Sequence, residues 1–281
     1  MNVQEIVTNR FIEKLESGVI PWRKTWSTSY GLPRNFLTKK PYSGINLFLL
    51  GGFDRPNFLT YNQTRKLGGK VRRGAKSEIV VFWSVSWKGL DGKWYKDEVL
   101  GGTKSFILKY FRVFNQVDIE GIDFSDGGGL EGVDREGRNE LCESFIAGLD
   151  ADIRVGDGEP KYMLLRDCIT VPSRESFESI DNFYSVLFHE LIHWTGSPRR
   201  LKRFDSSSTG LKEYAKEELI AELGSSFLCA QLGVDNDDVF EDQASYLASW
   251  IKALKGDSRL LMSASTAARK ASEFVLSFDV A

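Results

Sequence analysis

Histidine is nearly absent from this chain, which has two among 281 residues, and cysteine is scarce, with three. The cysteines are odd in number, lie far apart and form no C-x-x-C pair, so we expect buried thiols in a reducing cytoplasm: Cys142, Cys168 and Cys229. No apolar run approaches 18 residues, which excludes a transmembrane helix, and residues 1–18 lack the apolar core of a signal peptide. The composition therefore predicts a soluble, cytoplasmic protein without a membrane partner.

Charge is divided unequally along the chain. Residues 1–116 hold 20 Lys and Arg against 8 Asp and Glu, a balance of +12, whereas the remainder holds 17 against 31, a balance of −14. Five of the seven tryptophans also precede residue 117. Halves of opposite sign indicate two domains with different partners, and we expect the basic half to bind a polyanion.

Glycine punctuation and hydrophobic periodicity predict an α+β protein with a linker at residues 125–140, between a first domain at 1–124 and a second at 141–281. The segment 45–50 is compatible with a helix or a strand. Periodicity and capping signals predict helices over 3–17, 61–67, 140–149, 179–196, 212–232, 244–255 and 260–276, with Ser179 or Asp181 as the cap of the fourth. Strands are expected at 79–83, 92–96 and 105–114, with two or three more within 152–171.

Both histidines fall in one pentapeptide, His189-Glu190-Leu191-Ile192-His193. On a helix, residues four apart share one face, so both imidazoles can reach one cation. Glu190 would then lie beside the metal, where its carboxylate can take a proton from bound water. This H-E-x-x-H spacing predicts one divalent metal ion per chain, with zinc as the expected ion and His189 and His193 as ligands.

A catalytic zinc needs a third protein ligand and an open position, and with no further histidine this ligand must be a carboxylate or a cysteine. An acidic segment, Glu217 to Glu222, follows among apolar residues that indicate a buried helix. One residue of register separates the alternatives Glu217 and Glu218, whereas Cys229 lies too many helical turns away to compete well. The segment resembles the E-x-x-x-(D/E) pattern of Glu-type zincins, which implies Glu218 as the third ligand and Glu222 as the carboxylate that orients a histidine.

The implied chemistry is metal-assisted hydrolysis, in which Glu190 accepts a proton and passes it to the leaving amine. Peptide hydrolysis usually also needs a donor for the developing oxyanion. Four tyrosines are open for this role, and each is equally an ordinary packing residue: Tyr162, Tyr184, Tyr214 and Tyr246.

Basic and aromatic side chains are interleaved in the first 83 residues. Cations that follow phosphates and rings that stack on bases hold single strands without sequence preference. For any one of these residues, a solvated basic surface over an aromatic core is the alternative. We predict contacts with single-stranded DNA from Trp22, Arg23, Lys24, Trp26, Arg34, Lys40, Tyr42, Lys70, Arg72, Arg73, Lys76 and Trp83.

Several motifs, in order along nearly the whole chain, resemble those of ArdC-type antirestriction proteins, whose amino-terminal domain also begins some plasmid conjugative primases. In many family members a histidine follows the Trp-Thr-Gly of the metal-binding motif, whereas Ser197 stands here; this removes a further ligand or surface group and leaves the three predicted ligands intact. The matching stretches are 7–10, 18–24, 33–35, 40–46, 67–74 and 113–115 in the first half, and 188–196, 200–201 and 217–224 in the second.

The resemblance implies a single-stranded-DNA-binding domain at 1–124, a zincin-like metallopeptidase domain at 141–281, and protection of incoming mobile DNA from host restriction. Two functions stay open. The chain is either a DNA-tethered metallopeptidase, with a restriction-system component as one conceivable protein substrate, or a strand-coating protein of conjugative transfer whose metal site is structural or vestigial. The intact Glu190 favours retained chemistry, because a structural site needs no general base. A DNA-mimicking inhibitor would be acidic throughout, unlike the basic half of this chain.

Overall fold

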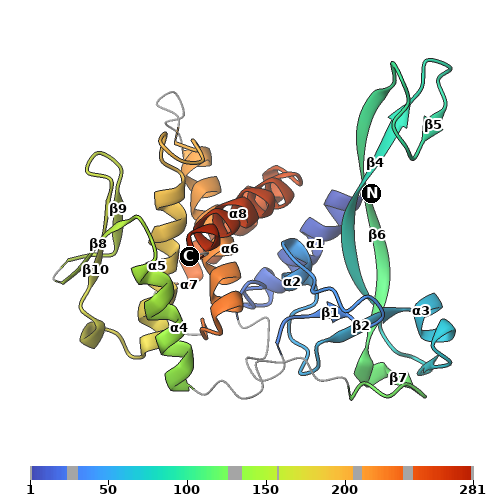
Figure 1. The fold of residues 1–281 in the computed structure, drawn as a ribbon, viewed down its shortest axis with the longest axis horizontal. Helices are drawn as coiled ribbons and strands as arrows, with labels where there is room; N and C mark the ends of the chain where they lie inside the picture. The colour runs from blue at the N-terminus through green and yellow to red at the C-terminus, as the bar shows by residue number, and fades with distance from the viewer. Residues whose placement is uncertain are drawn as a thin grey trace.

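The computed structural model describes residues 2–23, 31–125, 135–156, 158–204, 211–236 and 243–279. A group of helices stands between a small sheet on one side and a larger sheet with a long hairpin on the other (Figure 1). The helices are α1 (Val3–Glu16), α2 (Ile45–Leu49), α3 (Tyr61–Lys66), α4 (Arg135–Ala147), α5 (Ile180–Thr195), α6 (Leu211–Leu232), α7 (Gln243–Gly256) and α8 (Leu260–Leu276).

The larger sheet has the strand order β1-β2-β6-β4-β5. β1 and β2 run parallel and the other neighbours run antiparallel. β4 pairs along its whole length with β6, from Glu78 opposite Val113 to Lys88 opposite Thr103. This hairpin, residues 78–115, extends away from the helices in Figure 1 and is called the arm below. The strands of this half are β1 (Arg34–Asn35), β2 (Asn57–Thr60), β3 (Lys70–Val71), β4 (Glu78–Lys88), β5 (Trp94–Tyr95), β6 (Thr103–Asn115) and β7 (Ile119–Glu120).

A buried asparagine attaches the base of the arm to helix α2. The Asn46 amide donates to the carbonyl of Val81 at 2.9 Å and accepts from its backbone N–H at 2.7 Å. Gly44, immediately before the helix, has a φ of 59°, a conformation that glycine adopts without the steric cost of a Cβ. The segment 45–50, for which the sequence allowed two conformations, is therefore a short buried helix beside β4.

The smaller sheet and the helices from α4 to α8 form the carboxy-terminal half. β10 (Cys168–Pro172) lies between the parallel strand β8 (Asp152–Gly156) and the antiparallel edge strand β9 (Lys161–Met163). Helix α6 packs against both α5 and α8. At Gly224 the approach to α5 is so close that an added Cβ would lie 2.8 Å from the side chain of Ile192. Glycine here lets the two helices that carry the predicted metal ligands meet.

One hydrophobic core runs through both halves of the chain. Val7 and Phe11 of α1 belong to the same buried cluster as Leu191 of α5. Phe48 of α2 stacks on Phe227 of α6 with ring centroids 4.8 Å apart, and α1 packs against α7. The amino-terminal half therefore contributes directly to the core that supports α5 and α6.

The predicted helices and strands agree closely with those observed. Helix α5 begins after Ser179, whose side chain accepts from the N–H of Asn182, as its capping signal indicates. α4 begins at Arg135, inside the segment 125–140 that was expected to be a linker. The boundary between two domains stays a prediction. In the described ranges no helix combines the length and hydrophobicity needed to cross a bilayer.

Candidate metal centre and nucleic-acid interface

Helices α5 and α6 bring together the two histidines and three glutamates of the predicted site. Nε2 of His189 lies 3.1 Å from Nε2 of His193. The carboxylate of Glu218 lies within 3.6 Å of both, with Oε2 near His189 and Oε1 near His193. One donor atom from each of these residues falls within 4.8 Å of the other two. The structure thus places the three predicted ligands around one point.

The second nitrogen of each imidazole faces another carboxylate. Nδ1 of His189 lies 3.5 Å from Glu222, and Nδ1 of His193 lies 3.3 Å from Glu217. A carboxylate at Nδ1 favours the tautomer that carries its proton there, which leaves the Nε2 lone pair free to bind a metal. Two such lone pairs pointing at each other across 3.1 Å repel unless a proton or a metal ion lies between them.

Glu217 has a role that sequence reasoning missed. It was considered as an alternative ligand, but its carboxylate is shared between His193 and the guanidinium of Arg203, which donates from Nη2 at 2.7 Å and from Nε at 3.0 Å. Arg203 also donates to the carbonyl of Ile192 on α5. Glu217 is therefore placed to orient His193. Because Arg203 lies in the connection between α5 and α6, no helical spacing could have revealed this contact.

The shifted pKa values in the cluster show that its carboxylates favour a positive charge beside them. Burial lowers the pKa of His189, but the carboxylates of Glu218 and Glu222 outweigh burial and raise this pKa to about 10. Burial raises the pKa of Glu218, but the hydrogen bonds with His189 and Tyr214 and the charges of the two histidines together outweigh burial, so the net direction is downward. Ionised carboxylates that stabilise a proton on His189 would stabilise a divalent cation in its place, and metal binding would release that proton.

The donor set fits a divalent metal ion. Two imidazole nitrogens bound at about 2.0–2.1 Å to one tetrahedral ion lie about 3.3 Å apart, close to the separation seen between the two Nε2 atoms. Catalytic zinc sites use three protein ligands, whereas structural zinc sites are closed by four. In the ranges that the structure describes, the group of ligands has three members.

Glu190, the predicted base, is held beside the edge of the smaller sheet. Its Oε2 accepts a 2.7 Å hydrogen bond from the backbone N–H of Tyr162 in edge strand β9. The Tyr162 hydroxyl donates to Asp167 at 2.8 Å, and Arg200 contacts both of these side chains. These contacts hold strand β9 in place, and the backbone of β9 in turn holds the carboxylate of Glu190.

Among the three candidate oxyanion-stabilising tyrosines whose side chains the structure describes, Tyr214 is the one that contacts a predicted metal ligand. Its side chain hydrogen-bonds to Glu218, and the residue is 63% exposed. The Tyr162 hydroxyl is already bound to Asp167, and buried Tyr184 donates to Glu143 at 2.6 Å. The side chain of Tyr246 lies outside the described residues. The catalytic role itself stays a prediction.

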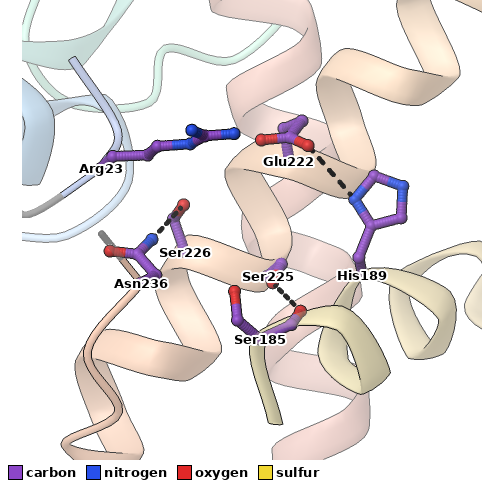
Figure 2. Close-up of a pocket in the computed structure, with 7 residues that line it drawn as sticks. All are labelled: Arg23, Ser185, His189, Glu222, Ser225, Ser226 and Asn236. Atoms are coloured by element: carbon purple, nitrogen blue, oxygen red, sulfur yellow. Dashed lines mark hydrogen bonds and ion pairs between the residues drawn. The ribbon is translucent and has the colours of Figure 1, made fainter. Parts of the chain in front are cut away.

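Ten of the twelve residues predicted to contact DNA fall into three groups. Six are exposed, on the larger sheet and the segments around it: Lys40, Lys70, Arg72, Arg73, Lys76 and Trp83. Arg23 and Arg34 are half-buried, with Arg23 directed into a pocket beside Glu222 and Arg34 donating to Asn57 (Figure 2). Lys24 and Trp26 lie outside the described residues.

Two of the DNA-contact predictions need correction. Trp22 is 0% exposed and Tyr42 is 7% exposed, so neither ring offers a face to a base. Trp22 packs with Trp250 of α7, and Tyr42 packs against Phe58 of β2. Both rings belong to the core because distant helices and strands cover them, which their basic neighbours in the sequence do not indicate.

The arm presents aromatic residues that sequence reasoning did not select. Residues opposite each other in an antiparallel pair share a face, and the register places Val85 opposite Phe106 on the face that also carries Trp83 and Tyr110. Trp83 is 51% and Phe106 is 59% exposed. Lys104 lies over the Phe106 ring at 5.4 Å. Side chains alternate between the two faces of a strand, so the sequence indicates which residues of one strand share a face. Only the pairing register shows which residues of β4 and β6 lie on the same face.

Comparisons with known proteins agree with this arrangement. Residues 1–114 match the family model for the N-terminal domain of the anti-restriction factor ArdC, and residues 140–267 match that for a zincin-like metallopeptidase. The metal-free crystal structure of the antirestriction ArdC protein from plasmid R388 is 33% identical, with a TM-score of 0.80 over 99% of this chain and 98% of that one. This chain belongs to the ArdC antirestriction family.

Other family members extend the comparison. The Mn(II)-bound structure of the R388 ArdC protein is also 33% identical, with a TM-score of 0.78 over 100% of this chain and 99% of that one. Two Escherichia coli proteins named DNA primase TraC are 34% and 33% identical over 98% of this chain, which spans only 27% and 20% of their lengths. The uncharacterized protein y4eC of Sinorhizobium fredii (strain NBRC 101917 / NGR234) is 29% identical over 98% of this chain and 91% of its own length.

We predict that matched substitutions on α6 separate a ligand from an orienting residue. Glu218→Gln should weaken Zn²⁺ binding by more than about 100-fold, because it removes a ligand, whereas Glu217→Gln should cost about 10-fold through the orientation of His193. Competition with a chelating dye measures both affinities. His189→Ala and His193→Ala should also lose the metal. A greater loss in Glu217→Gln than in Glu218→Gln would shift the ligand assignment by one residue.

Proposed function

We propose that this protein is an antirestriction protein that binds single-stranded DNA through its amino-terminal half and carries a divalent-metal-dependent peptidase site in its carboxy-terminal half. The proposal rests on the geometry of the predicted ligands: His189, His193 and Glu218 converge on one point. Glu190 is the neighbour of His189 on helix α5. A closed structural site would need a fourth ligand and no base.

A divalent ion at this site would polarise a peptide carbonyl and make a water molecule more acidic. Zinc is the expected ion from the donor set, and the Mn(II)-bound relative indicates that other divalent ions are acceptable to the family. His189, His193 and Glu218 would hold the ion, while Glu222 and Glu217 keep the imidazoles in the tautomer that binds it.

Glu190 has the surroundings of a general base. Its carboxylate would accept the proton of the attacking water and pass it to the leaving amine nitrogen. The N–H of Tyr162 holds one carboxylate oxygen in place at 2.7 Å, so the base keeps its orientation before substrate arrives. Tyr214, exposed beside Glu218, is the side chain best placed to donate to a developing oxyanion.

The charge and the exposed rings of the amino-terminal half support single-stranded DNA as its ligand. The cluster Lys70–Lys76 begins in β3 and ends directly before the arm, and its cations are exposed. The paired segments of β4 and β6 contain four cations among their aromatic residues: Lys88, Lys104, Lys109 and Arg112. The acid Glu78 of these segments forms an ion pair with Arg10. Exposed rings beside cations suit unpaired bases, because base pairing in a duplex covers the faces on which they stack.

The division of charge restricts where the strand can lie. The balance of +12 in residues 1–116 attracts phosphates, and the −14 of the remainder repels them. A bound strand would therefore be kept on the arm and the Lys70–Lys76 cluster. A peptidase attached to DNA in this way would act on proteins that meet the same strand, and a component of the restriction system is the substrate class that fits an antirestriction role.

We predict that DNA affinity depends on Trp83 and on two neighbouring arginines. In the full-length protein, Trp83→Ala should weaken binding of a single-stranded oligonucleotide by about 5- to 150-fold, through the loss of stacking. Arg72→Ala/Arg73→Ala should make the slope of log affinity against log salt shallower by about 1.4, because two phosphate contacts are lost. Fluorescence anisotropy across a salt series measures both effects.

The matched control removes two exposed cations from the acidic half, as Lys252→Ala/Arg259→Ala. Affinity and salt slope should both stay at the wild-type values. Equal effects of the control and Arg72→Ala/Arg73→Ala would mean that general charge, and no defined interface, holds the strand.

We predict that Glu190→Gln separates peptidase activity from binding. The amide oxygen of glutamine can still accept from Tyr162, so the variant should keep its fold, its metal and its DNA affinity. Cleavage of unfolded casein by the Zn²⁺- or Mn²⁺-loaded protein should fall by about 100- to 10000-fold, because the base is missing. Wild-type protein that holds metal and cleaves nothing, or a variant as active as wild type, would refute the peptidase assignment.

The same variants show which activity protects DNA. Entry of unmodified plasmid DNA into a restricting host should lose protection when Arg72, Arg73 and Trp83 are all replaced by alanine, because binding to the strand comes first. Loss of protection in Glu190→Gln would show that proteolysis is also required, and retained protection would favour coating of the strand. Full protection by a triple variant that no longer binds DNA would contradict this order.

A further inference from the structure

Trp22 joins the amino-terminal half to the metal centre. Its indole Nε1–H donates a 3.2 Å hydrogen bond to Oε2 of Glu222 on α6, a contact between residues 200 positions apart in the chain. The other oxygen of that carboxylate, Oε1, lies 3.5 Å from Nδ1 of His189. A single carboxylate therefore connects a side chain of the basic half with a predicted metal ligand.

The Trp22 side chain is enclosed by packing. The residue is fully buried, with Phe11 of α1 stacked at 6.4 Å and Trp250 of α7 edge-on at 5.0 Å. Its backbone carbonyl accepts from the side chain of Asn236 at 3.3 Å. The indole N–H is consequently fixed in direction by contacts that have nothing to do with Glu222.

Glu222 is buried, so the position of its carboxylate depends on nearby donors such as the Trp22 indole N–H. Glu222 is 7% exposed and faces a small pocket that Arg23, His189 and Asn236 also line. Figure 2 shows the guanidinium of Arg23 and the imidazole of His189 on either side of the Glu222 carboxylate. A buried carboxylate is stabilised by donors of fixed direction, and the position of its second oxygen follows from where the first is bound.

We infer that Trp22 is a positioning residue of the metal centre, which acts on His189 through Glu222. The inference rests on the proposed metal site and adds to it a contribution from the amino-terminal half. Without the indole N–H, the carboxylate of Glu222 can turn, and His189 loses part of the restraint on its ring and tautomer. Substitution of the partners that orient metal-bound histidines typically costs about 10- to 100-fold in metal affinity.

The test replaces the indole by a ring without a donor. Trp22→Phe in the full-length protein should weaken Zn²⁺ binding by about 10-fold, measured by dye competition. It should also alter the visible absorption spectrum of the Co²⁺-loaded protein, because the spectrum reports ligand geometry. Trp87→Phe makes the same chemical change on β4 of the arm, outside the metal cluster, and should leave Zn²⁺ affinity and the Co²⁺ spectrum unchanged.

A double-mutant cycle separates positioning from loss of packing. Glu222→Gln alone should weaken Zn²⁺ binding, and Trp22→Phe should add less than about 2-fold in that background, because residues that act through one contact are not additive. Full additivity would mean that Trp22 acts by packing alone and would overturn the inference. Thermal melting of each variant shows how much stability it loses, and the cycle cancels a loss common to both backgrounds.

The outcomes distinguish this inference from the proposed function. If the wild-type protein had no measurable Zn²⁺ affinity, the proposed metal site itself would be refuted. Wild-type protein that binds Zn²⁺, together with a Trp22→Phe variant of equal affinity and equal Co²⁺ spectrum, would leave the metal site standing and overturn only the role of Trp22.

Discussion

The pairing of each imidazole with a carboxylate at Nδ1 is the constraint on which the site depends. Glu222 holds His189 and Glu217 holds His193, so that both Nε2 atoms point at Glu218. Three acids on one helix can reach two histidines on another only if the helices lie in close contact, and Gly224 against Ile192 provides that contact. The four acids nearby would repel one another in an apolar interior, and a cation among them relieves this repulsion.

The two halves of the chain are chemically different but structurally continuous. The basic, aromatic arm extends away from the helices, whereas α1 and α2 pack into the core beneath the metal centre. Trp22 donates a hydrogen bond to Glu222, and Arg23 lines the same pocket as that carboxylate. A short physical route thus connects the basic half with the zincin-like half, from an indole through a carboxylate to an imidazole.

Local sequence signals predicted the helices and strands, whereas packing between distant segments determined which side chains meet and which are buried. The spacing of His189 and His193 is a property of one helix, so the sequence predicted it correctly, and of the two caps open for that helix, Ser179 and Asp181, the structure uses Ser179. The choice between Glu217 and Glu218 is a rotation of about 100° on α6, and only the contact with α5 settles which carboxylate faces the histidine pair. Trp22 was assigned to DNA from its basic neighbours, although α1 and α7 bury it. The aromatic face of the arm depends on a pairing register between strands that no local pattern contains.

Nitrogen NMR of the imidazoles tests the central claim most directly, because the untagged chain has only two histidines. In protein labelled with ¹⁵N-histidine, saturating Zn²⁺ should move the Nε2 resonances of both rings into the metal-bound range, while both Nδ1 atoms stay protonated beside Glu222 and Glu217. Metal-induced shifts at Nδ1, or a response from only one ring, would contradict a site built from two imidazoles that carboxylates hold in the same tautomer.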